Sequence, residues 1–164
     1  MSDDIKRLQR DAKFIAKGNL FEDFEPGQVF EHHWGRTLNA GDNSQFTTLT
    51  LNFNPLYYNV EFAKAHGHKS EVIHPLLVFN TVFGLSVEDL SEAGGPFLGV
   101  DELTYHMPVY PGDTLTARSK TANVRPSARN PAIGIVTWHT EGFNQRSDRV
   151  IDFHRTNIVR KRNP

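Results

Sequence analysis

The residues of this chain that could carry chemistry stand on either side of a short bridge. Asn52, Asn54 and Tyr57 come first, and His74 follows directly before a proline. A neutral histidine can take up a proton near neutral pH, and an asparagine can orient water through its carbonyl oxygen. A phenol with an ordinary pKa of ~10 suits a proton donor better than a base. Together these residue types would suit a site that moves protons to and from water.

A helix that begins at Pro75 would hold His74 at its mouth. Proline is favoured in the first helical turn because its missing N–H costs nothing there, and an apolar run continues from it to Leu90. The first turn of a helix has free N–H donors at the positive end of the helix dipole. Leu76 or Leu77 would therefore offer a backbone N–H to a substrate oxygen that gains negative charge.

Each of these residues also has a structural interpretation. Asn52 and Asn54 could satisfy the backbone where the chain breaks before a proline, and His74 could be a cap or a core contact. His66 and His68 suggest a metal ligand pair, but no third ligand follows at a helical or hairpin spacing,. We expect no metal site.

The stretch resembles the MaoC-like dehydratases, which are acyl-thioester hydratases with a hot-dog fold. The positions that carry this resemblance are Asn54, Pro55, Leu56, the run 61–65 and His74. The chain departs from the family pattern at three positions, where Asn52 replaces an aspartate, Tyr57 a histidine and Pro75 a glycine. A branch that resembles mesaconyl- and itaconyl-CoA hydratases also has asparagine at the first of these positions. The resemblance extends over residues 20–160, nearly the whole chain.

The resemblance implies the reversible addition of water to an enoyl-CoA, with a branched dicarboxylic acyl group as the expectation for this branch. CoA would be part of the substrate, and no other cofactor is expected. His74 would take the role of base, Asn52 would orient water, and Tyr57 would donate or position. Arg125 and Arg129 are candidates for the CoA phosphates, because a guanidinium matches phosphate geometry.

Two other functions stay open. A non-catalytic acyl-thioester binding module would keep the fold and lose the family aspartate and histidine. A hot-dog thioesterase would need a carboxylate on the central helix, and none stands there until Glu88.

The composition is that of an ordinary globular domain. The chain has 164 residues with 23% charged and 38% hydrophobic residues and a net charge of −1, which gives no reason to expect nucleic acid or anionic membrane as a partner. It has no cysteine, so disulfides and thiolate chemistry are excluded,. No apolar run approaches the ~20 residues of a membrane helix, and we expect a cytoplasmic protein.

The elements that must position the site follow a hot-dog order. We predict a first strand over 29–38, a helix over 42–51 capped by Asp42 with Phe46 and Leu49 facing inward, and the long helix from Pro75. Further strands are predicted over 97–107, 114–124, 133–144 and 150–159. The fold class is thus α+β, a curled antiparallel sheet around a long central helix.

The predicted organisation has a polar segment over 1–20, a single hot-dog domain over 21–160 and a basic tail over 161–164. Long strands with apolar alternation would leave an exposed sheet edge. We therefore expect a homodimer or a dimer of dimers.

Overall fold

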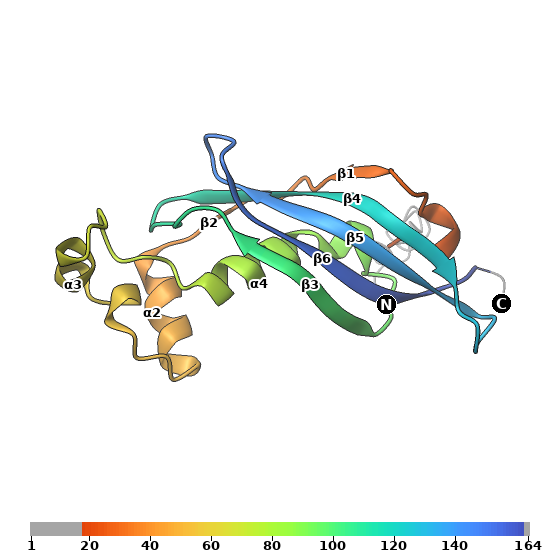
Figure 1. The fold of residues 1–164 in the computed structure, drawn as a ribbon, viewed down its shortest axis with the longest axis horizontal. Helices are drawn as coiled ribbons and strands as arrows, with labels where there is room; N and C mark the ends of the chain where they lie inside the picture. The colour runs from red at the N-terminus through yellow and green to blue at the C-terminus, as the bar shows by residue number, and fades with distance from the viewer. Residues whose placement is uncertain (1–17, 163–164) are drawn as a thin grey trace, which may run out of the picture.

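The computed structural model describes residues 18–162, and it has the predicted curled sheet around a central helix (Figure 1). Most of the predicted polar segment and half of the predicted tail lie outside these residues. The strands are β1 (Val29–Glu31), β2 (Arg36–Thr37), β3 (Phe97–Tyr105), β4 (Thr114–Pro126), β5 (Ile133–Phe143) and β6 (Arg149–Arg160). The helices are η1 (Phe21–Asp23), α2 (Ala40–Leu49), η2 (Pro55–Tyr57), α3 (Val60–Ala65), α4 (Pro75–Leu85) and α5 (Val87–Leu90). None of the helices in this part of the chain is long and apolar enough to cross a bilayer.

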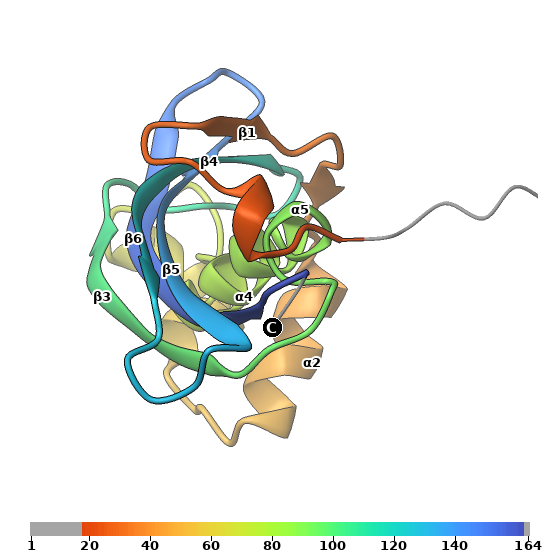
Figure 2. The same cartoon turned by 90° about the vertical axis from the view of Figure 1, so that its right-hand side faces the viewer.

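The sheet is antiparallel and has the order β1-β4-β5-β6-β3, with β2 also paired to β4. Seen along its length, it curls around α4 (Figure 2). The alternation predicted for the strand over 114–124 is confirmed, because every second side chain, at Leu115, Ala117, Ser119 and Thr121, is buried. Within residues 18–162, β3 pairs with β6 alone, so one side of β3 is an edge of this sheet.

Helix α4 packs into the concave face of the sheet. Val78 and Val82 share one apolar core with Ile151 and Phe153 of β6. A Cβ at Gly142 of β5 would come within 2.6 Å of Val82, so this glycine lets the helix approach closely. The tight contact fixes the position of the helix relative to the sheet.

The predicted run of one helix to Leu90 is interrupted at Ser86. The buried hydroxyl of Ser86 donates to the carbonyl of Phe83 at 2.8 Å and accepts from Arg155 at 2.8 Å. Arg155 has no exposed surface, and burial lowers the pKa of its guanidinium to about 10. The same guanidinium reaches Ser91 at 2.7 Å. A buried cation therefore holds the ends of α4 and α5, where helix carbonyls carry negative charge.

Two local predictions before the central helix are wrong in part. The strand over 29–38 is two short strands, and Trp34 between them is exposed. In α2 the N-cap is Asn39 rather than Asp42, and the two residues form a reciprocal capping box,. The predicted inward face of α2 is wrong at Leu49, which is 74% exposed, whereas Phe46 is half-buried and packs near His74. Asn43 is the buried polar residue of this helix.

Candidate functional site

The buried side chain of Asn43 joins the segments that carry the predicted site residues. Its Oδ1 accepts the backbone N–H of His74 at 2.7 Å, and its amide group donates to the carbonyls of Tyr57 at 2.6 Å and Val72 at 2.9 Å. A buried amide with these three partners fixes the position of loops that are not held by strand-to-strand hydrogen bonds. Asn43 thereby sets η2 against the start of α4.

His74 is the N-cap of α4, as predicted, and its side chain is buried. Its ring lies 5.1 Å from the ring of Phe46 and 4.6 Å from that of Tyr57, measured between centroids. Burial lowers the pKa of His74 below its usual value, because the charged form loses its hydration,. Burial therefore favours the neutral form of His74.

Two donors face the nitrogens of His74. The backbone N–H of Leu76 lies 3.1 Å from Nδ1, and Nδ2 of Asn52 lies 2.6 Å from Nε2. A neutral imidazole has one acceptor nitrogen and one N–H, so it cannot accept from both. If Nδ1 accepts from the N–H of Leu76, Nε2 carries the hydrogen and donates to the oxygen of Asn52 after its amide has rotated. If Nε2 instead accepts from Nδ2 of Asn52, the N–H of Leu76 is left without an acceptor. The tautomer of His74 thus determines which of the two groups, the Leu76 N–H or the Asn52 amide, is free to bind a ligand.

The other backbone amides at the start of α4 already have acceptors. Leu77 and Val78 both donate to the carbonyl of His74, at 2.9 and 3.1 Å, and Pro75 has no N–H. Of the two amides predicted as donors to a substrate, Leu76 is the one whose partner can change. Leu77 instead lines a second hollow on the other side of α4, together with Trp34.

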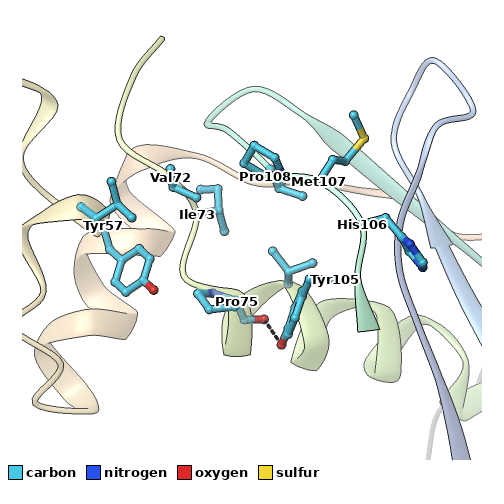
Figure 3. A pocket seen from close by; sticks show the side chains of 11 residues that line it. Tyr57, Val72, Ile73, Pro75, Tyr105, His106, Met107 and Pro108 are labelled. Atoms are coloured by element: carbon cyan, nitrogen blue, oxygen red, sulfur yellow. Dashed lines mark hydrogen bonds between the residues drawn. The ribbon is translucent and has the colours of Figure 1, made fainter. Parts of the chain in front are cut away.

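A cavity of about 370 Å³ opens beside this cluster (Figure 3). Its lining is mostly apolar and consists of Leu56, Tyr57, Val72, Ile73, Pro75, Val78, Tyr105, His106, Met107, Pro108 and Val109. A cavity of this kind suits a small acyl group. Among the described lining residues there is no carboxylate and no lysine or arginine.

The phenols of Tyr57 and Tyr105 approach the cavity from different elements (Figure 3). Tyr105 donates to the carbonyl of Pro75 at 2.9 Å. Burial and the neighbouring phenol of Tyr57 raise the pKa of Tyr105. The next residue, His106, follows the end of β3, and its ring contacts Asp152 of β6.

The remaining predicted residues lie apart from the cavity or serve the backbone. Asn54 caps η2 by accepting the N–H of Leu56 at 3.0 Å. Arg125 and Arg129 belong to the end of β4 and to the connection that follows it, at the opposite end of the sheet from α2 and α3 (Figure 1). Within one chain the structure therefore does not bring these arginines to His74.

The sequence did not predict two residues of the site, Asn43 and Tyr105. Asn43 lies within a helix, where an asparagine usually faces solvent, and its three partners come from later segments. Tyr105 is one of several apolar or aromatic residues in a predicted strand. Local sequence carried no signal for either role.

Known proteins are similar to this chain over most of its length. The family model described as mesaconyl-CoA hydratase matches residues 2–164. A mesaconyl-CoA hydratase of Haloarcula hispanica is 36% identical over 149 residues, which are 90% of this chain and 42% of that protein. The crystal structure of a MaoC domain protein dehydratase from Chloroflexus aurantiacus is 36% identical, with a TM-score of 0.85 over 90% of this chain and 42% of that one.

A third comparison bears on the fold alone. The structure of Rv0216 from Mycobacterium tuberculosis, described as a double hotdog fold, has a TM-score of 0.82 at 24% identity and covers 89% of this chain and 45% of that one. The chain thus spans less than half the length of these relatives. With a family model that matches nearly all of its residues, the chain belongs to the mesaconyl-CoA hydratase family and has the hot-dog fold.

Proposed function

We propose that this chain takes part in the reversible hydration of an enoyl-CoA, with a branched dicarboxylic acyl group of the mesaconyl type as its substrate class. The observation that carries the proposal is the environment of the His74 imidazole. Hydrogen-bond donors from Asn52 and Leu76 approach its two nitrogens, and an acyl-sized cavity lies next to it. CoA enters as part of the substrate. The mesaconyl class itself rests on the family and on the names of its relatives.

Hydration places the oxygen of water on Cβ and a hydrogen on Cα. As the C–O bond forms, the electron pair of the C=C bond moves toward the thioester oxygen, and water loses a proton. We assign that proton to Nε2 of His74, and the imidazolium then returns it to Cα. Donors held in place stabilise the thioester oxygen while it is negative.

The tautomers of His74 would couple the base to the oxyanion donor. Nε2 can take a proton only when Nδ1 carries the hydrogen, and in that tautomer the N–H of Leu76 has no acceptor within the site,. The freed N–H would then bind the thioester oxygen, with the phenol of Tyr57 beside it. Asn52 would have to leave Nε2 and donate from Nδ2 to the oxygen of the incoming water instead,.

We also propose that the chain pairs with a second hot-dog domain along the edge strand β3. Phe97, Leu98 and Leu103 of the edge strand β3 are exposed, and an apolar sheet edge favours pairing with another chain. Because the relatives are more than twice as long as the matched region, we propose that a second hot-dog domain pairs here, in a homodimer or a dimer of dimers. Arg125 and Arg129 would reach CoA phosphates only from such a second subunit.

A mass-spectrometric screen of enoyl-CoA esters in ¹⁸O-labelled water tests the function. Label in the acyl group at Cβ, with mesaconyl-CoA ahead of crotonyl-CoA, is the expected result. Release of the free acid would instead indicate a thioesterase. In the structure, however, Glu88 accepts a hydrogen bond from Trp34 and lies outside the cavity.

Binding without turnover would favour the non-catalytic acyl-thioester module. In that case the double change Asn52→Asp with Tyr57→His restores the family residues and should create hydratase turnover. An enzyme that is already competent should gain little from the same change.

A further inference from the structure

Tyr105 joins the edge strand to the start of the central helix. It is the last residue of β3, lines the cavity and is 40% exposed. Its hydroxyl donates to the carbonyl oxygen of Pro75 at 2.9 Å (Figure 3). The ring thus forms part of the cavity wall, and the hydrogen bond to Pro75 fixes the position of its oxygen.

This bond determines what the oxygen of Tyr105 can do for a ligand. A phenol has one O–H donor and can also accept, and the single proton of Tyr105 is used by Pro75. Toward the cavity, the oxygen of Tyr105 can therefore only accept a hydrogen bond. The hydroxyl of Tyr57 has no hydrogen-bond partner among residues 18–162, so its proton is available for donation.

Few other polar side chains face the described cavity. His106 also lines the cavity, but its ring is engaged with Asp152, and the remaining lining side chains are apolar. One donor and one acceptor in an apolar cavity match a 3-hydroxyacyl thioester, whose carbonyl oxygen accepts and whose hydroxyl donates. They also match the reverse partner, an enoyl thioester with an attacking water.

We propose that Tyr105 is a further substrate-contacting residue, whose phenol oxygen accepts a hydrogen bond from the attacking water and from the hydroxyl of the hydrated product. This assignment rests on the proposed hydratase function. It gives the two tyrosines complementary tasks, since Tyr57 donates to the thioester oxygen and Tyr105 holds the oxygen that joins Cβ.

The contact can be measured by binding, apart from turnover. The two ligands are 2,2-difluoro-3-hydroxybutyryl-CoA, which has no hydrogen at Cα and cannot be dehydrated, and 2,2-difluorobutyryl-CoA, which lacks the hydroxyl. Calorimetry on the full chain should find the hydroxylated ligand bound more tightly, by about two- to tenfold for one hydrogen bond. Both hydroxyl configurations are measured separately.

Tyr105→Phe should abolish this preference, and it keeps the ring, so the fold should survive; a thermal melt verifies that. Tyr57→Phe should weaken both ligands equally, because both carry the thioester oxygen. Tyr58→Phe is the matched control: its hydroxyl donates to the carbonyl of Phe53 at 2.7 Å outside the cavity lining, and binding should not change.

The outcomes separate this assignment from the proposed function. If Tyr105→Phe keeps the preference, or weakens both ligands alike, the assignment is wrong even in an active hydratase. A preference that depends on Tyr105 in a chain that hydrates no enoyl-CoA would leave the contact standing and remove the hydratase function. Failure of both ligands to bind would overturn the assignment of Tyr105, whereas the labelled-water screen with mesaconyl-CoA would still decide the hydratase function.

Discussion

Oδ1 of Asn43 accepts a 2.7 Å hydrogen bond from the backbone N–H of His74, 31 positions further along the chain. The same side chain holds the carbonyls of Tyr57 and Val72. A single amide in α2 therefore sets the distance between the helix mouth and the loop that faces it. The position of the candidate base depends on a residue that does not touch the cavity.

Asn43→Ala should destabilise the chain by about 2–4 kcal/mol, because it leaves buried backbone groups without partners. Asn43→Asp should also destabilise, since a carboxylate can still accept from His74 but cannot donate to two carbonyls. Urea unfolding measures both free energies. Asn80→Ala, on the exposed face of α4, is the control and should change stability by less than about 0.5 kcal/mol,. Equal effects at Asn43 and Asn80 would contradict the bridging role.

His74→Ala should lower kcat for enoyl-CoA hydration by roughly two to four orders of magnitude, the usual range for loss of a general base. Asn52→Ala and Tyr57→Phe should cost less, because neither residue takes the proton from water. Steady-state kinetics on mesaconyl-CoA measure these losses. His33→Ala changes an exposed histidine and serves as the control.

Turnover that survives His74→Ala would mean that the base lies elsewhere. Asp42, His66 and His68 would then be next in line within this chain. A carboxylate from a second domain would be a further source.

The pH dependence of turnover should follow the neutral form of His74. Because burial lowers the pKa of His74, kcat/KM should stay high as pH falls through ~6.5, the ordinary histidine value. It should drop only near the lower pKa of the folded chain. An acid limb at or above ~6.5 would argue against this buried base.

The same pKa shift predicts how stability responds to acid. The unfolded chain protonates His74 near ~6.5 and the folded chain only below it, so the free energy of unfolding decreases as pH falls through that interval. Burial of His32 lowers its pKa and acts in the same direction. His74→Ala should reduce the difference in stability between pH 7 and pH 5, which urea unfolding at the two pH values measures.

Leu103→Glu should separate the proposed dimer, because it puts a charge on the exposed apolar edge of β3. Light scattering at micromolar concentration should show the wild type as a dimer or larger and the variant as a monomer. Val29→Glu places the same charge on the opposite edge strand, β1, and should not alter the mass. A wild-type monomer at this concentration would refute the pairing.

The sequence predicted the parts of the fold that local rules determine. Pro75 specified the start of the central helix, and alternation specified the strand that contains Leu115 and Ala117. The predicted inward position of Leu49 in α2 is wrong, because this helix packs its buried polar Asn43 on loops rather than an apolar stripe on the sheet. The prediction that the polar residues of the site lie close together holds for His74 and Asn52, whose side chains are in contact.

The role of each residue in that cluster depends on tertiary contacts that no local pattern encodes. The tautomer conflict at His74 exists only because Leu76 and Asn52 approach different nitrogens of one ring. The distance of Arg125 from the cavity likewise follows from the length of β4, which carries its far end away from α2.

Tyr105 ends the strand that forms the sheet edge and also lines the cavity. A ligand that fixes this ring also restricts the backbone on which a second domain would pair. If a second domain pairs at this edge, binding and association are thermodynamically linked, and each changes the equilibrium constant of the other by the same factor. A ligand that tightens the assembly is then bound more weakly by the dilute monomer.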